Sequence, residues 1–182
     1  ALSSMPKAPL ANGGNAHATF ALGAVQAQVW QASGQAPRAL AWFDTPFGGR
    51  IELAMRGTGR IERAKFDIKG TRGSLTVPGY YNTPLAIAEF GLAGSVSEQG
   101  RKLEIASFRV KTDGPTIETS GTFVGDEVTW FYAGDYSLSA FPASDIKKYW
   151  PEGLKPHARE WVVSNITDGS VEHLGLRISL RK

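Results

Sequence analysis

The sequence of 182 residues has no cysteine and only three histidines. The absence of cysteine excludes a disulfide scaffold, a cysteine nucleophile and thiolate metal sites. His17, His157 and His173 are far apart in the sequence and form none of the paired spacings of zinc sites, so we expect neither a metal nor another cofactor. No apolar run approaches the length of a membrane-spanning helix, and no signal-peptide pattern opens the chain.

Motifs of the common enzyme classes are also absent. Gly57 and Gly59 lack the third glycine of a dinucleotide-binding loop and lead into a predicted strand. There is no Gly-x-Ser-x-Gly nucleophile elbow. The adjacent Asp126 and Glu127 fall in a predicted turn. We therefore expect no catalytic residues and no enzyme. A carbohydrate-processing enzyme with two carboxyl groups about 5–10 Å apart stays open as an alternative.

Glycine is abundant, with 21 residues, and apolar residues occur in short alternating runs. Turn residues divide the sequence at intervals of about 10–14 residues, too short for helices to lie between the strands. We therefore predict a mainly β fold, a curved antiparallel meander in a single domain over residues 17–182. The predicted strands are residues 19–30, 39–43, 50–55, 60–68, 74–77, 85–96, 102–112, 116–124 and 127–139, after a loop or frayed segment at 1–16.

Two of these strands carry further information. In residues 127–139, apolar side chains share one parity and polar ones the other, so one face of the sheet is predicted to be apolar and the other solvated. In residues 102–112 the apolar parity switches between Ile105 and Phe108. This switch predicts a β-bulge at Ala106 and Ser107 that bends the sheet.

The apolar period changes from two to about 3.6 after Phe141, which predicts a short helical hairpin at residues 142–166. Its two helices are predicted at residues 142–150 and 156–166, and a closing strand follows at residues 170–180. Trp150 and Trp161 lie on the predicted apolar stripes. We expect both to be buried against the sheet, and either alanine substitution to destabilise the domain by about 3–5 kcal/mol.

The segment LSAFPASDIKKYWPEGLKPHAREWVVSNITDGSV, residues 138–171, resembles the AsmA-like envelope proteins of Gram-negative bacteria, in particular the YhdP-type branch. The order of elements is similar too, with a glycine-punctuated series of strands before the Tyr-Trp-Pro hairpin and a strand after it. The preceding strands, residues 17–139, match the family only in their general pattern of short strands separated by glycines and contain no specific family motif. The resemblance gives a structural role to Tyr149, Trp150, Pro151, Gly153, Leu154, Arg159, Trp161 and Gly169.

This resemblance implies one segment of a long periplasmic protein whose inner-membrane anchor is not in this chain. Members of the family are expected to form extended, curved β-sheets whose apolar channel carries lipid towards the outer membrane. The implied partners are lipid acyl chains, neighbouring segments of the same polypeptide and other envelope proteins. A piece of a longer polypeptide is also expected because the first residue is not Met and residues 178–182 still alternate like a strand.

The pattern of the residues leads to a related hypothesis by a separate route. A long meander has one apolar face, and two short helices can cover only part of it. The rest must meet a second sheet, a neighbouring segment or an apolar ligand, and alternation does not distinguish an open groove from a closed core. The pattern is compatible with a trough for acyl chains. Together with what the resemblance implies, this gives our leading hypothesis, transport of lipid, phospholipid being the expected class, along an apolar β-groove. The predicted lipid contacts are Val128, Trp130, Tyr132, Leu174, Leu176 and Ile178.

Two alternatives concern other partners. A scaffold or adaptor domain could bind other envelope proteins through open sheet edges.

The net charge is +3, and basic residues are densest in residues 50–72. Only Phe66 lies among them as an aromatic residue, so a nucleic-acid partner is not expected. We interpret this cluster as a solvated strand face, with an anionic partner as the alternative.

Overall fold

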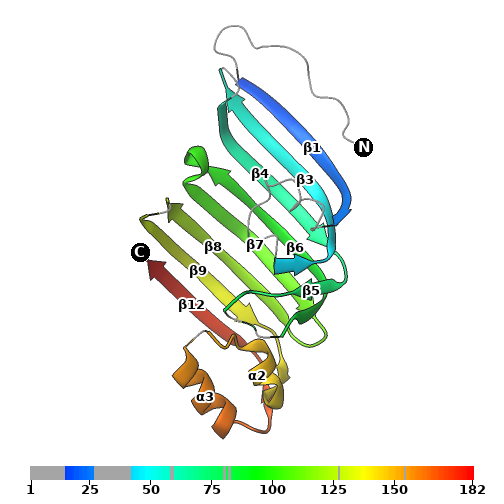
Figure 1. Cartoon of the computed structure of the whole chain (residues 1–182), viewed down its shortest axis with the longest axis vertical. Helices are drawn as coiled ribbons and strands as arrows, with labels where there is room; N and C mark the ends of the chain where they lie inside the picture. The colour runs from blue at the N-terminus through cyan, green and yellow to red at the C-terminus, as the bar shows by residue number, and fades with distance from the viewer. Residues whose placement is uncertain are drawn as a thin grey trace.

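The computed structural model describes residues 15–26, 42–57, 60–79, 81, 83–126, 128–153 and 155–182. Most of them form one antiparallel sheet with the strand order β1-β3-β4-β6-β7-β8-β9-β12 (Figure 1). These strands are β1 (Asn15–Gln26), β3 (Pro46–Arg56), β4 (Arg60–Gly70), β6 (Leu85–Ser97), β7 (Lys102–Thr112), β8 (Thr116–Gly125), β9 (Trp130–Leu138) and β12 (Leu174–Arg181). The sheet is open, with β1 and β12 at its edges.

Short elements complete the fold. Strands β2 (Phe43–Asp44) and β5 (Gly73–Leu75) pair with each other, and β5 also pairs with the first residues of β6. Strands β10 (Phe141–Pro142) and β11 (Ser170–Val171) form a separate pair. The helical elements are the single turns η2 (Glu98–Gly100) and η3 (Ala143–Asp145) and the helices α2 (Ile146–Tyr149) and α3 (Pro156–Asn165). The predicted fold class, a curved antiparallel meander with a short helical hairpin, is confirmed.

The strand boundaries agree with the sequence prediction at most places and differ at four. The closing strand predicted at residues 170–180 is divided, because β11 pairs with β10 and only β12 joins the large sheet. Strand β1 begins at Asn15, inside the segment predicted as a lead-in. Strand β3 continues through the predicted break at Gly48 and Gly49, because glycine at position 49 lets β3 lie close to the backbone of Asp67. Strand β9 begins only at Trp130. Residues 1–14, 27–30 and 39–41 of the predicted elements lie outside the described residues.

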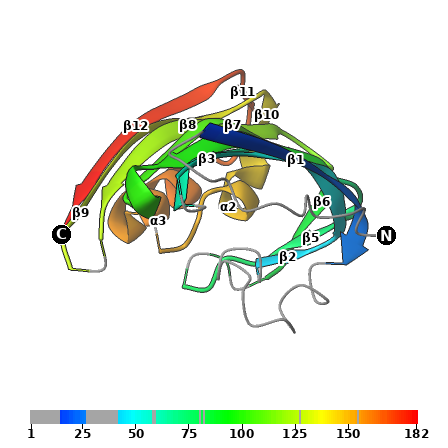
Figure 2. The ribbon, with the colours of Figure 1, turned by 90° about the horizontal axis from the view of Figure 1, so that it is seen from above.

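The predicted bulge is confirmed. The pairing between β7 and β8 shifts register between Ile105 and Phe108, and the pairing between β6 and β7 shifts at Ala93 and Gly94. An extra residue on one strand increases the local bend and twist. Figure 2 shows the result, a sheet bent into an arch with α2, α3, β2 and β5 on its inner side.

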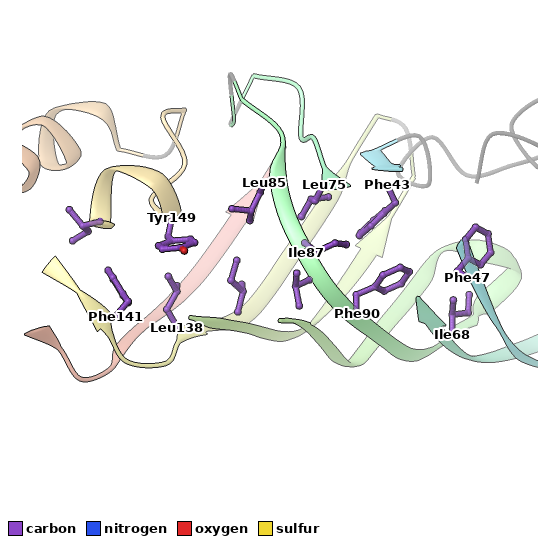
Figure 3. Close-up of a cluster of buried hydrophobic side chains, with 13 residues drawn as sticks. Phe43, Phe47, Ile68, Leu75, Leu85, Ile87, Phe90, Leu138, Phe141 and Tyr149 are labelled. Atoms are coloured by element: carbon purple, nitrogen blue, oxygen red, sulfur yellow. The ribbon is translucent and has the colours of Figure 1, made fainter. Parts of the chain in front are cut away.

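The hydrophobic core lies between the inner face of the arch and these covering elements (Figure 3). Directly opposite residues of an antiparallel pair share one face, so the register shows which side chains point inward. The buried members of the core are Phe43, Phe47, Ile68, Leu75, Leu85, Ile87, Phe90, Val110, Ile117, Leu138, Phe141, Ile146 and Tyr149. Those on the sheet come from the strand halves nearest the covering elements. The core therefore fills one half of the arch.

The helical hairpin differs from its prediction in both helices. Residues 142–150 form the end of β10, the turn η3 and a single turn of α-helix rather than one continuous helix. Trp150 caps α2 and packs in part on the core. Trp161 has 63% of its surface exposed, so the expectation that it is buried is wrong, and Trp161→Ala is no longer expected to be strongly destabilising. The apolar stripe did not show which side of α3 faces the sheet, and Val162 and Val163 make that contact.

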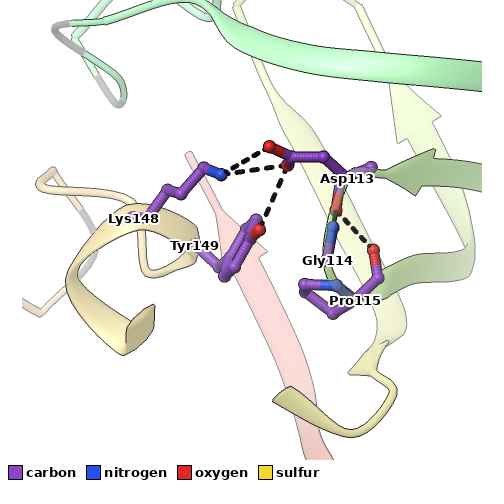
Figure 4. A network of polar contacts seen from close by, with 6 residues as sticks. Asp113, Gly114, Pro115, Lys148 and Tyr149 are labelled. Carbon is purple, nitrogen blue, oxygen red and sulfur yellow. Dashed lines mark hydrogen bonds and ion pairs between the residues drawn. The ribbon is translucent and has the colours of Figure 1, made fainter. Parts of the chain in front are cut away.

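Tyr149 is the anchor of the hairpin, with 1% of its surface exposed. Its hydroxyl donates to Asp113 Oδ1 at 3.3 Å, and Lys148 Nζ lies 2.9 Å from both oxygens of the same carboxylate (Figure 4). The Lys148 hydrogen bond is the main reason that the pKa of Asp113 is lowered and that of Lys148 raised. Arg159 joins the two helices, donating from Nε to the Trp150 carbonyl at 3.1 Å and from a terminal nitrogen to the Lys147 carbonyl at 2.8 Å.

A second buried contact holds the segment after β5 against α2. The Tyr81 hydroxyl donates to the carbonyl oxygen of Tyr149 at 3.1 Å. Burial raises the pKa of Tyr81 to about 12, and it also raises the pKa of Tyr136. Among the described residues the Tyr136 hydroxyl has no hydrogen-bond partner of good geometry, although Tyr81 is near enough to influence its ionisation. Both phenols are therefore neutral groups that the folded state protects from ionisation.

We expect the fold to lose stability between about pH 10 and pH 12. The pKa of Tyr81 is higher in the folded than in the unfolded chain, so its contribution is complete below pH 10 and falls as the pH rises to about 12. A pKa difference of two units between the folded and unfolded chain corresponds to about 2–3 kcal/mol in the free energy of unfolding. Tyr81→Phe should make the dependence shallower, which denaturant unfolding at several pH values would measure. An equally steep loss in Tyr81→Phe would assign the effect to other groups.

Candidate functional site

The half of the inner face beyond the core is apolar from one edge of the sheet to the other. The register aligns one residue from each strand into rows that cross the arch. The outer row consists of Ala18, Leu53, Ala64, Val96, Leu103, Phe123, Tyr132 and Leu180. The glycine row consists of Phe20, Ile51, Phe66, Gly94, Ile105, Gly121, Gly134 and Ile178. Neither row contains a charged residue.

These rows are less covered than the core. Their side chains are half-buried, and that of Leu180 on the edge strand is 49% exposed. The helices and the β2–β5 segment lie over the other half of the strands, as Figures 1 and 2 show together. The two rows therefore form an apolar surface that the described residues leave partly open.

Three glycines on the central strands leave space for aromatic rings to lie flat on this surface. A Cβ atom at Gly94 would lie 2.8 Å from Phe66 Cζ, and one at Gly121 would lie 3.0 Å from Tyr132 Cε2. The same tyrosine ring covers Gly134. Phe66 and Tyr132 thus lie along the sheet over the glycines, an arrangement in which aromatic rings shield the exposed backbone of a strand. At these glycines the inner face therefore presents aromatic rings rather than bare backbone.

Five of the six predicted lipid contacts lie on this inner face. Trp130 and Tyr132 are on β9, and Tyr132 belongs to the outer row. The Trp130 ring stacks on Phe123 of the same row, with centroids 5.7 Å apart. Ile178 on β12 belongs to the glycine row. Leu174 and Leu176 lie further along β12, where they line a small apolar cavity beneath the hairpin. That these residues contact lipid stays a prediction.

Val128 is not on the strand. It lies in the turn between β8 and β9 with 77% of its surface exposed. The Asp126 carboxylate accepts hydrogen bonds from the backbone N–H groups of Val128 and Thr129, at 3.0 and 2.9 Å, and so closes the turn before the strand begins. These bonds are also the main reason that the pKa of Asp126 is lowered. Placing Val128 on the alternating strand face was therefore wrong.

The family-motif residues have several different environments. Tyr149 is buried, and Trp150 and Pro151 lie at the junction of the hairpin with the sheet. Gly169 has a φ of 101°, a conformation that favours glycine. Gly153 is exposed, as is Trp161, and Leu154 lies outside the described residues. The motif thus combines anchoring residues with surface residues.

Most residues of the two open rows were missed from the sequence because we chose candidates from the most regular alternation. Phe20, Ile51 and Leu53 come from the first half of the chain, where Gly-Gly and Thr-Gly pairs interrupt the pattern. The alternating parity of the strand at residues 50–55 was a usable signal. What the sequence lacks is the register, which places Leu53 and Leu103 in one row although 50 positions separate them.

The outer face is polar and of mixed charge. The basic cluster is exposed on β3 and β4, as expected for a solvated strand face. A shallow hollow there is lined by Arg50, Glu52, Lys65, Asp67 and Glu104, together with Phe66 and small residues. The register sets Arg50 opposite Asp67 and Glu52 opposite Lys65. Two of the three carboxylates thus have a cation as cross-strand neighbour, which does not favour the facing pair of free carboxyl groups that a glycosidase needs.

Comparison of the chain with protein-family models, curated proteins and solved structures finds no match. In the described ranges, no three His, Asp or Glu side chains are grouped so that they could hold a metal ion. Among the described residues, neither helix has the length and apolar character needed to cross a bilayer. The apolar inner face is therefore the candidate site that the geometry offers.

Proposed function

We propose that this chain is a segment of an AsmA-like periplasmic protein that carries lipid, in particular phospholipid, between the inner and outer membranes. The observation that supports this most is the pair of uncharged rows that cross all eight strands of the arch and stay partly open. On this proposal, acyl chains lie against the inner face and replace water there. The full-length protein would be anchored in the inner membrane by a part outside this chain.

The shape of the surface suits an acyl chain. Burying apolar area contributes roughly 25 cal/mol per Å², without any requirement for hydrogen-bond partners. The rows reach both β1 and β12, so a neighbouring segment of the polypeptide that continues the sheet would continue the apolar surface. A passive protein of this kind needs no catalytic residue.

A second candidate is a scaffold or adaptor that binds another envelope protein by strand addition. The open edges favour it, because among the described strands β1 and β12 each have a partner on one side only. This candidate predicts a complex whose formation depends on the edge strands. Lipid transport predicts dependence on the inner face.

Ile178→Asp tests lipid transport directly. Ile178 faces inward on the edge strand and Ser179 faces outward, so Ser179→Asp introduces the same charge at a neighbouring position on the opposite face. An unpaired carboxylate among acyl chains is strongly unfavourable. We expect Ile178→Asp to lower the transfer of fluorescent phospholipid between vesicles about tenfold or more, and Ser179→Asp to leave it near wild type.

Mass spectrometry of the organic extract of each purified variant provides an independent measurement of bound lipid. Thermal melting must show that Ile178→Asp is folded; if it is not, Leu103→Asp places the charge elsewhere in the outer row. Equal lipid contents in wild type, Ile178→Asp and Leu103→Asp would contradict the proposal. Loss of folding in both inner-face variants would identify this face as ordinary core.

A further inference from the structure

Exposed apolar side chains gather at the strand ends opposite the helices. Of the eight large apolar residues exposed in the described part of the chain, five lie at this end of the sheet. They are Ile61, Val124, Val128, Phe131 and Leu180. The most exposed is Val128 at 77%, at the tip of the turn between β8 and β9. In Figure 1 this turn lies beside the C-terminal end of β12.

Basic residues surround the same turn. On the outer face the register sets Lys102 opposite Val124, Val124 opposite Phe131, and Phe131 opposite Arg181. Arg101 is adjacent, since its carbonyl oxygen accepts the Gly125 N–H at 2.8 Å. We name this group the β8–β9 corner; its members are Arg101, Lys102, Val124, Val128, Phe131 and Arg181.

The cations of the corner are not neutralised by ion pairs within the part of the chain that the structure describes. None of Arg101, Lys102 and Arg181 is in a salt bridge there. Asp126 lies close to Arg101 and offsets part of its charge, while its carboxylate accepts the two backbone hydrogen bonds that close the turn. The corner therefore combines exposed apolar tips with three cations that form no salt bridge among the described residues.

We propose that the β8–β9 corner docks on the surface of an anionic lipid bilayer. Apolar tips that enter the headgroup region and cations that meet anionic lipids are the two contributions that hold peripheral proteins on membranes. A stable protein interface takes roughly 800 Å² on each side, whereas membrane docking can be achieved by a few apolar tips with cations beside them. Docking does not require the inner face to carry lipid, so either proposal can fail without the other.

Co-sedimentation of the 182-residue chain with vesicles tests the docking. We expect binding to phosphatidylcholine vesicles that contain phosphatidylglycerol, little binding to phosphatidylcholine alone, and weakening by salt. Each cation near an anionic surface contributes about a fivefold factor in affinity. The double variant Lys102→Gln/Arg181→Gln should therefore bind about 25-fold more weakly. Phe131→Ser should also weaken binding, with an unchanged dependence on salt.

The control is Lys65→Gln/Lys69→Gln, which removes the same charge from the outer face of β4. It should retain wild-type binding within about twofold, since these residues are away from the corner. Circular dichroism shows whether each variant is folded; the substituted side chains are exposed except that of Lys102, which is half-buried. Equal losses in the corner and control variants, or equal binding to both kinds of vesicle, would overturn the proposal. A dimer that sedimentation velocity detects and Lys102→Gln/Arg181→Gln dissociates would assign the corner to a second copy instead.

Discussion

Tyr149→Ala will lower the free energy of unfolding by about 3–5 kcal/mol, as expected for loss of a fully buried aromatic side chain. The Tyr149 ring packs edge-on against Phe141 with centroids 5.7 Å apart, and its hydroxyl bonds Asp113 on the turn between β7 and β8. The substitution removes both contacts and leaves a cavity beneath the hairpin. For a chain of this length the melting temperature should fall by about 6–20 °C.

Trp161→Ala is the matched comparison, because it truncates a larger aromatic residue of the same hairpin. Trp161 is 63% exposed, so we expect a change within about 0.5 kcal/mol. Denaturant unfolding of the two variants measures the difference, and Tyr149→Phe separates the hydroxyl from the ring. If Trp161→Ala destabilises the domain as much as Tyr149→Ala does, the side of α3 that carries Trp161 packs against the sheet, which would contradict this arrangement.

The second large effect is expected at Phe90 and Gly70, a directly opposite pair on β6 and β4. The Phe90 ring lies over Gly70 and tilts against Phe43 with centroids 4.8 Å apart. We expect Phe90→Ala to destabilise the domain by about 3–5 kcal/mol. Gly70→Ala should also destabilise it, by about 1–3 kcal/mol, because the new methyl group would collide with the ring.

The double variant makes this prediction specific. With the ring removed, the added methyl group has space, so Gly70→Ala should be nearly neutral in the Phe90→Ala background. In a double-mutant cycle measured by denaturant unfolding, the double variant should lose about 1–3 kcal/mol less stability than the sum of the two single variants. Additive effects would show that the Gly70→Ala penalty comes from the backbone of β4 rather than from Phe90.

Much of the fold was predictable because the signals are local. Alternation of side chains along a strand depends only on neighbouring residues, and so do turns such as Asp113-Gly114-Pro115. The parity switch after Ile105 was enough to locate the bulge. The helical segments begin at or directly after Pro142 and Pro156, although the first is a 3₁₀ turn followed by a single turn of α-helix.

The candidate site was only partly predictable. Alternation placed Trp130, Tyr132 and Ile178 on the apolar face, and the register confirms that they share it. Val128 continued the same parity in the sequence, but the side-chain bonds of Asp126 hold it in a turn. A local polar contact of this kind overrides apolar periodicity at the end of a strand.

What the sequence by itself determined is the set of strands, their apolar face, the bulge and the place of the helical hairpin. The tertiary structure decided which parts of that face are covered. Tyr149 rather than Trp161 became the buried anchor, because the hairpin lies on the sheet through α2 and leaves one side of α3 in solvent. Burial depends on which elements lie above a residue, and a periodic pattern describes only the element itself. For the same reason, rows that join β1 to β12 exist only once the register aligns residues distant in the sequence.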